Sequence, residues 1–365
     1  MRTFGFYTDL MKKPVKTTLW ILAVLAGFPI VYLLGIVALL TFTEFSPVSK
    51  SKVQISGHGE RMITSRREFT LFTWNIGYAG LGREMDFFYD GGNKTRPEQG
   101  QTDKYFKGIQ QVIKANDSAD FILLQEIDVY SKRAWYHNEY IGLSSLLSTY
   151  CHGFSPNYNC RFVPLPVTEP MGSVKAGLAT FSLYKPEEAL AQYYKSDFPW
   201  PTRLVMLKRC YMLFRYRLDN MKDLLIVNLH NSAYDSTGAL RERELKVLDS
   251  VLNSEYRKGN YVIAGGDWNS NPRGFAMDMI QQGDRITTID PPIPDRFLPG
   301  WTFVYDSLHP SNRFTDIPYL KGVTRTTIID FFVISPNVEI NYVTTIPTGF
   351  AFSDHEPVLM SVRLH

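Results

Sequence analysis

The pattern of hydrophobic and polar residues divides the chain into two unequal parts. The first part contains a long apolar run, with no charged residue between Lys16 and Glu44. A helix rises about 1.5 Å per residue, so a run of this length can cross a bilayer. Basic residues precede the run, and such residues favour the cytoplasmic side of a membrane. We therefore expect a cytoplasmic N-terminus over 1–16 and a single-pass transmembrane signal anchor over 17–43, with the rest of the chain outside the cytoplasm (in the periplasm, if bacterial).

A cleaved signal peptide is the alternative interpretation of this run. Its apolar region would be shorter, about 7–15 residues, and a small-residue cleavage site should follow it. The residues that do follow, TFTEFSPVSK, offer no good site of that kind. The sequence therefore favours an uncleaved anchor.

The second part has the pattern of a domain that mixes helices and strands. Residues 44–67 are polar and indicate a linker, so we place the folded domain at 68–365. Side chains alternate between apolar and polar over 69–76, and short apolar runs indicate buried strands. Amphipathic patterns predict helices after Thr102 and over 239–256, and a further helix is expected over 139–148. Strands are expected at 69–76, 121–125, 161–163, 178–184, 204–218, 223–230, 261–264, 328–334 and 358–364. Helices alternate with strands in places and strands adjoin strands elsewhere, which predicts an α+β fold with mixed sheets.

Several of these predicted strands end in a polar residue. Asn75, Glu126, His230 and Asp267 each follow an apolar run, and Asn269 lies two residues after Asp267. An unpaired carboxylate at the end of a buried strand is costly unless it is hydrogen-bonded or binds a cation. Each residue alone could be an ordinary structural residue, but the recurrence of the pattern indicates one site where strand ends meet.

Further charged residues lie in or beside apolar strands. Asp330 lies inside the run IIDFFVI, where a carboxylate needs a partner such as a histidine. Asp354 and His355 lie in SDHEP, just before the last strand, and a histidine oriented by a carboxylate can take a proton from water. The set is rich in oxygen ligands and lacks clustered cysteine and histidine, which favours Mg²⁺, or Mn²⁺, over zinc. Glu126 and Asp354 would suffice as ligands, and such a site would hydrolyse a phosphate ester.

Composition adds two constraints. The chain has 365 residues, 44% of them hydrophobic, which is enough for a large core. Its formal net charge of +3 is poor evidence for a nucleic-acid-binding surface.

Cys151, Cys160 and Cys210 match no zinc-binding spacing. In an extracytoplasmic domain Cys151 and Cys160 could form a disulfide, and three free thiols are the alternative.

In chain order, the polar residues lie in the motifs TWNIG, LLQEID, IVNLHNSAYD, GGDWN, TTIIDFFVI and SDHEPV. This series resembles the endonuclease/exonuclease/phosphatase superfamily, which includes DNase I-like nucleases, neutral sphingomyelinases and inositol-phosphate phosphatases. The resemblance covers 68–365 and is most similar in character to bacterial members with a membrane anchor. It implies a four-layer sandwich, in which helices flank two packed mixed β-sheets, in addition to the N-terminal transmembrane helix.

The resemblance also implies a role for each residue that would hold the metal or move a proton. Mg²⁺ would be held mainly by Glu126, with Asp354 and Asn75 nearby. His355 would be the general base, and Asp330 would orient it.

Other residues would, by the same resemblance, act on the substrate. His230 would steady the phosphate or assist the leaving group, and Asp267 and Asn269 would position water and phosphate oxygens, with Asn75 also near the substrate. The first motif continues as GYAG, where nucleases acting on abasic DNA usually have N-G-L-R, and this departure disfavours a role in DNA repair.

Three functions are compatible with these observations. The first is a membrane-anchored, Mg²⁺-dependent phosphoesterase that hydrolyses a phospholipid or another membrane-proximal phosphodiester. The second is an extracytoplasmic nuclease, and the third is a non-catalytic binding module. A nuclease would need a basic face, for which the candidates are Arg203, Lys208, Arg209, Arg215 and Arg217. The sequence indicates no protein partner.

Aromatic residues gather in two of the predicted loops, and they could either contact lipid or pack in the core. They are Phe87, Phe88 and Tyr89 in one loop and Phe297, Trp301 and Phe303 in the other.

Overall fold

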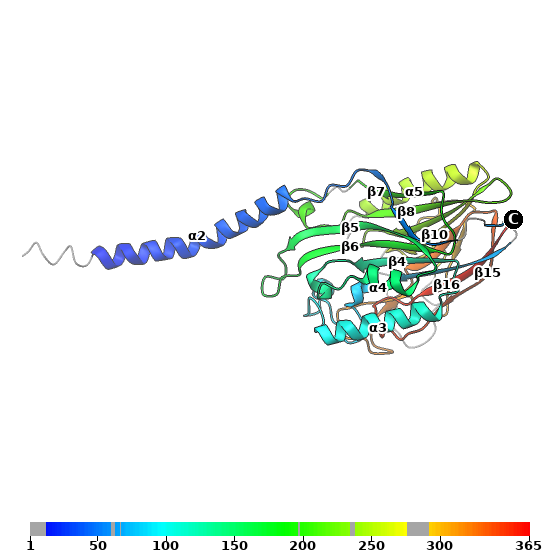
Figure 1. The fold of residues 1–365 in the computed structure, drawn as a ribbon. Helices are drawn as coiled ribbons and strands as arrows, with labels where there is room; N and C mark the ends of the chain where they lie inside the picture. The colour runs from blue at the N-terminus through cyan, green and yellow to red at the C-terminus, as the bar shows by residue number, and fades with distance from the viewer. Residues whose placement is uncertain (1–11, 60–62, 66, 196–197, 234–237, 276–291) are drawn as a thin grey trace, which may run out of the picture.

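The computed structural model describes residues 12–59, 63–65, 67–195, 198–233, 238–275 and 292–365. One long helix, α2 (Lys12–Phe42), projects from a body of two β-sheets with helices on their outer faces (Figure 1). Within α2, the segment Trp20–Phe42 has a mean hydropathy of 2.5, and its described side chains are mostly exposed. Its length and composition suffice to cross a membrane, and Pro29 inside it is tolerated in such a helix.

The first sheet has the strand order β1-β7-β8-β9-β10-β14-β11. Its strands are β1 (Lys50–Lys52), β7 (Glu188–Tyr193), β8 (Cys210–Arg217), β9 (Asp223–His230), β10 (Tyr261–Asp267), β11 (Thr302–Val304) and β14 (Asp330–Ile334). β9 and β10 are parallel, with His230 opposite Asp267, and β14 is antiparallel to β10, with Asp330 opposite Asp267. The register therefore brings His230, Asp267 and Asp330 to the same edge of this sheet.

The second sheet has the order β15-β16-β3-β4-β6-β5-β2. Its strands are β2 (Ile55–Gly57), β3 (Glu68–Asn75), β4 (Phe121–Asp128), β5 (Cys151–Val163), β6 (Gly172–Ser182), β15 (Val338–Thr345) and β16 (Val358–Leu364). β3 and β4 are parallel, with Asn75 opposite Gln125, and β16 is antiparallel to β3. Asn75 and Glu126 therefore lie near the chain that enters β16, which carries Asp354 and His355.

Three helices cover the outer faces of the sheets, and together with the sheets they form four layers. α3 (Gln99–Ala115) and α4 (Glu139–Leu146) pack on the second sheet, and α5 (Ala239–Arg257) packs on the first. A third apolar cluster joins the inner faces of the two sheets. The predicted sandwich of two mixed sheets is thus confirmed. Short elements complete the chain: η1 (Gly77–Ala79), η2 (Phe88–Asp90), η3 (Lys132–Ala134), η4 (Thr202–Leu204), β12 (Asn312–Arg313) and β13 (Thr326–Thr327).

The segment 44–67, predicted to be a linker, contributes an edge strand to each sheet. β1 pairs with β7, and β2 pairs with β5. Both strands have three residues and are mostly polar. They have no apolar periodicity, and pairing with a strand far along the chain is what defines them.

Of the two alternatives for the cysteines, the structure has free thiols and no disulfide between Cys151 and Cys160. Cys151 and Cys160 both lie in β5, nine residues apart. A strand advances about 3.3 Å per residue, so about 30 Å separates them, which is beyond the reach of a disulfide.

The aromatic residues of the two predicted loops mainly pack in the core. Phe297 and Trp301 are buried with Trp268 in the cluster beneath α5, and Phe87 is buried as well. Tyr89 is exposed, at 42% of its surface. Core packing therefore accounts for most of these residues, and lipid contact does not.

A polar cluster interrupts the apolar interface between the sheets. Asn228, in the middle of β9, donates from Nδ2 to the carbonyl groups of Ala179 (2.9 Å) and Leu124 (3.2 Å) in the other sheet. Its Oδ1 accepts from Nε2 of Gln125 over 2.8 Å. A buried amide is costly unless it is paired, so these bonds favour one relative position of the two sheets, next to Glu126.

The C-terminal end of α2 packs directly on the domain. Leu40 is buried in an apolar cluster that includes Tyr158 and Cys160 of β5. Oγ1 of Thr41 accepts a hydrogen bond from the indole of Trp200 over 3.2 Å. The helix is therefore held against the body by both apolar and polar contacts.

This contact lies at the same end of the molecule as the polar strand ends. Asp128, at the end of β4, is opposite Ala176 of β6, and Ala176 is opposite Tyr158 of β5. Tyr78, three residues after Asn75, belongs to the same apolar cluster as Leu40. α2 thus meets the domain beside the carboxyl ends of β3 and β4.

Candidate active site

The polar residues predicted at the strand ends lie together, with Asp267 at the centre of the group. Nδ2 of Asn75 donates to Oδ2 of Asp267 over 3.0 Å, and Nε2 of His230 lies 3.3 Å from the same oxygen. Nε2 of His355 lies 3.8 Å from it. All these side chains are buried. Residues from both sheets therefore converge on one carboxylate oxygen.

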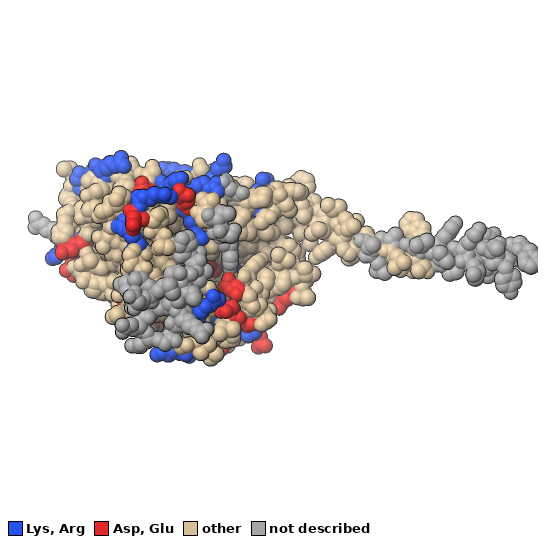
Figure 2. Space-filling model, turned by 180° about the vertical axis from the view of Figure 1, so that it is seen from behind, with Lys and Arg blue, Asp and Glu red and all other residues tan. Residues whose placement is uncertain are grey.

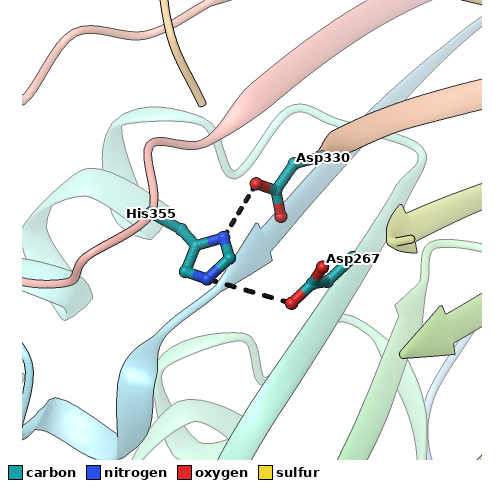
Figure 3. Close-up of side chains that lie close together, drawn as sticks. All are labelled: Asp267, Asp330 and His355. Carbon is teal, nitrogen blue, oxygen red and sulfur yellow. Dashed lines mark hydrogen bonds and ion pairs between the residues drawn. The ribbon is translucent and has the colours of Figure 1, made fainter. Parts of the chain in front are cut away.

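His355 and Asp330 form a hydrogen-bonded pair beside this group (Figure 3). Nδ1 of His355 lies 2.7 Å from Oδ2 of Asp330. Oγ of Ser311 donates to the same carboxylate oxygen over 2.8 Å and accepts from the backbone N–H of Asp330 over 3.0 Å. The other ring nitrogen, Nε2, accepts from the amide of Asn312 over 3.0 Å. In the neutral ring this arrangement places the proton on Nδ1 and the lone pair on Nε2.

Glu126 and Asp354 lie beside Asn75. Oε1 of Glu126 is 3.3 Å from Nδ2 of Asn75, whose Oδ1 accepts from the N–H of Gly77 over 3.0 Å. Oγ of Ser353 donates to the carbonyl of Asn75 over 2.8 Å and lies 3.3 Å from Oδ1 of Asp354. Asn75 therefore links the carboxylate of Glu126 to the central Asp267, and Ser353 holds Asp354 to the end of β3.

Local sequence explains why β10 ends in the buried carboxylate of Asp267. Gly266 has a φ of +141°, and a Cβ there would overlap the carbonyl oxygen of Leu229 in the neighbouring strand, so glycine is required. Trp268 is fully buried, stacks on Phe331 at 5.1 Å and donates to its carbonyl over 3.0 Å. These neighbours fix the direction of the Asp267 side chain.

Two site residues have a left-handed backbone. Glu126 has a φ of +55°, which is rare for residues other than glycine, and Asn269 has a φ of +49°, which asparagine adopts more readily. The N–H of Asn269 donates to Oδ1 of Asp267 over 2.9 Å. Its side-chain Nδ2 donates to the carbonyl of Asn231 over 2.9 Å. In this structure Asn269 therefore braces Asp267 and the loop that follows His230.

Burial makes the carboxylates of the site hard to ionise. It raises the pKa of Asp267 to about 7; the charge of His355 lowers this pKa, and the smaller effect of Asp330 raises it again. Burial also raises the pKa of Asp354 to about 6, and the charge of Glu126 adds to this rise.

The two histidines respond in opposite ways. Burial, with the nearby charge of Arg209, holds the pKa of His230 well below its usual range, so its imidazole is neutral at pH 7. Burial would also lower the pKa of His355, but the carboxylates of Asp330, Asp354 and Asp267 outweigh it and raise that pKa well above its usual value.

This crowding of buried negative charge fits a bound divalent cation. Glu126 and Asp354 make no ion pair with lysine or arginine among the described residues, and both are oxygen ligands of the kind that Mg²⁺ prefers. Ligand atoms of Asp267, Asp330 and His355 also lie within 4.8 Å of one another. Asp330 and His355 are already hydrogen-bonded to each other, so a divalent cation fits better beside Glu126 and Asp354.

Three residues of the site were not recognised from the sequence. Ser311 and Asn312 lie in a loop with no apolar periodicity, and only the fold brings them to Asp330 and His355. Arg209 was grouped with other basic residues, but its charge acts on His230, and its Nη1 is buried with no hydrogen-bond partner in the described part of the chain. An unpaired guanidinium beside the site could bind an anion.

The chain resembles known proteins in both sequence and fold. A sequence model of the endonuclease/exonuclease/phosphatase family matches residues 72–355, which is most of the chain and includes every predicted site residue. No curated protein matches the chain.

Several solved structures resemble this one. A family protein from Beutenbergia cavernae has a TM-score of 0.52 and 15% identity, over 82% of this chain and 72% of that one. The human Nocturnin catalytic domain with bound sulfate has a TM-score of 0.50 and 14% identity, over 86% of this chain and 97% of that one. A family protein from Bacteroides thetaiotaomicron has a TM-score of 0.50 and 14% identity, over 81% and 98%. At such identities the likeness extends to the fold alone.

Proposed function

The chain belongs to the endonuclease/exonuclease/phosphatase family, and on this premise we propose that it is a membrane-anchored, Mg²⁺-dependent phosphoesterase that hydrolyses a phosphodiester at the bilayer surface. Members of this family hydrolyse phosphoester bonds. The observation that carries the finer proposal is that the candidate site lies at the end of the domain against which α2 packs. A phospholipid, or another phosphodiester held near the membrane, is the favoured substrate.

His355 is the general base in this proposal. Its Nε2 takes a proton from the attacking water, and its Nδ1 keeps the hydrogen bond to Asp330 that orients the ring and stabilises the imidazolium. Ser311 holds Asp330 in place, because it both donates to and accepts from that residue. Asp267, 3.8 Å from Nε2, is placed to orient the water.

Glu126 and Asp354, with Asn75 beside them, would hold the divalent cation. When bound, the cation would neutralise these carboxylates, return the pKa of His355 towards neutrality and polarise the phosphorus–oxygen bond. Asn75 orients Glu126 through the 3.3 Å contact and connects it to Asp267. The strained backbone of Glu126 supports a functional role for this residue.

Neutral and cationic groups on the other side of Asp267 would receive the phosphate. His230 is neutral and can donate from Nε2 to a phosphate oxygen or to the leaving group. Arg209, whose Nη1 lacks a partner among the described residues, supplies a full positive charge there. Asn269 supports Asp267 through its N–H.

The residues that could form a basic face are mostly neutralised by acidic neighbours. Glu44 pairs with Arg203 (3.2 Å) and Lys208 (3.1 Å). Arg215 pairs with Glu255 over 3.0 Å, and Arg217 pairs with Asp223 over 3.0 Å. On the face seen in Figure 2, the described Lys and Arg side chains lie mainly along one edge, with Asp and Glu beside several of them. These pairings favour a lipid over a nucleic acid, whose backbone needs an unpaired basic surface.

We test the activity with the full-length chain in detergent, using bis-p-nitrophenyl phosphate and Mg²⁺. We expect turnover that EDTA abolishes, and a loss of about 10²–10⁴-fold in kcat for His355→Ala. The matched control is His365→Ala, because His365 is also paired with a carboxylate (Glu339, 2.8 Å) but lies at the opposite end of β16. Absence of turnover on any phosphoester would favour the binding module.

A substrate panel then tests the substrate class. Vesicles of sphingomyelin, vesicles of phosphoinositide and plasmid DNA are compared under the same conditions. We expect a lipid to be hydrolysed faster than DNA, and a preference for DNA would refute the lipid assignment in favour of the nuclease. For topology, a reporter fused after His365 should be active outside the cytoplasm, and activity only in the cytoplasm would overturn the orientation.

A further inference from the structure

A hollow of about 660 Å³ lies where α2 joins the domain. Phe42 and Thr43 line it, together with Arg161 of β5 and Lys175 of β6. The aromatic ring of Tyr130, which is 60% exposed, also borders it. This hollow is separate from the residues that bind Asp267, and the catalytic proposal does not use it.

The hollow carries unneutralised positive charge. Arg161 and Lys175 are exposed, and neither side chain makes an ion pair with a residue that the structure describes. Glu44 also lines the hollow, but its carboxylate is already paired with Arg203 and Lys208. Two cations therefore line the hollow, and the acid that lines it with them is already paired.

The position of the hollow follows from the end of the apolar helix. Phe42 is the last residue of α2 and is 88% exposed, and Glu44 is the first charged residue after the apolar run. The loop that joins β5 to β6 exposes Leu165 (46%) and Val167 (82%) on the same side of the domain. In Figure 2 the end of the domain nearest α2 carries mostly uncharged side chains. Apolar and aromatic groups around a basic hollow are the composition of a surface that meets lipid headgroups.

We propose that Arg161 and Lys175 in this hollow bind the phosphate headgroup of an anionic phospholipid. The lipid would belong to the membrane leaflet at the C-terminal end of α2. The guanidinium and the ammonium would each donate to phosphate oxygens, while Phe42 and Tyr130 contact the glycerol and the first part of the acyl chains. The inference rests on the proposed role of α2 as a membrane span. It adds a second lipid site, which holds the domain in one orientation and turns the candidate active site towards the bilayer.

Native mass spectrometry of the full-length chain in detergent micelles tests this inference. Equal amounts of phosphatidylglycerol and phosphatidylcholine are added, and the bound lipid is counted. Each basic residue at a membrane surface contributes about 1 kcal/mol towards anionic lipid, so we expect retention of phosphatidylglycerol to exceed that of phosphatidylcholine by about 30-fold. The double variant Arg161→Glu/Lys175→Glu should lose this preference.

A matched variant controls for the change in net charge. Lys107→Glu/Arg257→Glu alters exposed residues of α3 and α5 by the same total charge and should behave as the unmodified chain. Circular dichroism checks folding, and Arg161→Gln/Lys175→Gln, which also lacks the cations, replaces the Glu variant if that variant unfolds. Equal loss of preference in the control, or retention in both Arg161/Lys175 variants, overturns the inference.

Two further measurements distinguish a lipid headgroup from free phosphate, and the lipid site from the proposed catalytic function. Excess inorganic phosphate should leave phosphatidylglycerol bound, and its displacement would show a site for free phosphate instead. His355→Ala should bind the lipid normally, because lipid retention is measured without turnover. If the intact mass shows that α2 has been removed, the proposed anchor fails. If α2 is present and phosphatidylglycerol is not preferred, the lipid site alone fails.

Discussion

The carboxylate of Asp330 lies 2.7 Å from Nδ1 of His355, and both atoms are buried at the edge where the two sheets meet. This bond fixes the tautomer of the neutral imidazole, so that Nε2 is the nitrogen that accepts a proton. Asp330→Asn keeps the shape but can donate to Nδ1, which places the proton on the wrong nitrogen. We expect kcat to fall by about 10²–10⁴-fold with little change in KM, as measured on bis-p-nitrophenyl phosphate. Asp316→Asn, in an exposed ion pair with Arg325, is the control, and a change in KM alone would contradict the assigned role.

Arg209 should act on substrate binding. Arg209→Ala removes the unpaired guanidinium beside His230, and we expect KM to rise by about tenfold, corresponding to a charge-assisted hydrogen bond of about 1.5 kcal/mol. Arg209→Lys should restore part of the affinity. Arg217→Ala, which removes an exposed arginine paired with Asp223, should leave KM unchanged. Equal kinetic constants for Arg209→Ala and the unmodified chain would exclude contact with the phosphate.

Binding of Mg²⁺ should stabilise the folded domain measurably. A ligand at 100 times its Kd adds about 2.7 kcal/mol, which corresponds to a rise of a few degrees in Tm. We expect this rise in differential scanning fluorimetry of the full-length chain, and we expect Glu126→Gln to abolish it. Glu68→Gln, at the exposed start of β3, should keep it. A full shift in Glu126→Gln would place the cation elsewhere.

Most of the catalytic candidates could be predicted from the sequence because they break a strong apolar pattern. Glu126, His230 and Asp267 each end or interrupt a buried strand, where a polar group is costly unless it is hydrogen-bonded or binds a ligand. The parallel pairing of β9 with β10 then brings two of them together without any further information. The order of the motifs along the chain supplied the fold class.

The rest depends on contacts between segments far apart in the chain. Ser311 and Asn312 lie in a short polar loop and reach Asp330 and His355 only through folding. β1 and β2 are too short and too polar to leave a periodic pattern. Whether Arg209 is paired or free is likewise a property of its neighbours, because its sequence context is the same basic stretch that contains Lys208.

Stability should depend on pH through Glu255, far from the site. Burial would raise its pKa, but hydrogen bonds from Arg215, Lys258 and Asn260 outweigh burial and lower that pKa to about 2. A carboxyl group with a depressed pKa stabilises the folded state above its unfolded pKa of about 4.5, and this stabilisation is lost as the pH falls from there towards 2.

Glu255→Gln should therefore lower the free energy of unfolding by about 1–2 kcal/mol at pH 7 and by roughly half of that or less near pH 3. Urea denaturation at both pH values measures the difference. Glu187→Gln, whose partner Arg217 is 4.0 Å away and exposed, should cost little at either pH. An equal loss for Glu255→Gln at pH 7 and pH 3 would show that the effect is not electrostatic.

The hydrogen bonds of the Asn228 amide affect how the protein would respond to substitutions between the two sheets. One sheet contributes His230, Asp267 and Asp330, and the other contributes Asn75, Glu126 and His355, so neither half can act alone. A small displacement of one sheet relative to the other would separate His355 from Asp330, which orients it, and Asn75 from Asp267, while leaving each sheet intact. Substitutions in the apolar interface between the two sheets should thus abolish turnover before they unfold the protein. The hydrogen bonds of Asn228 across this interface oppose such a displacement.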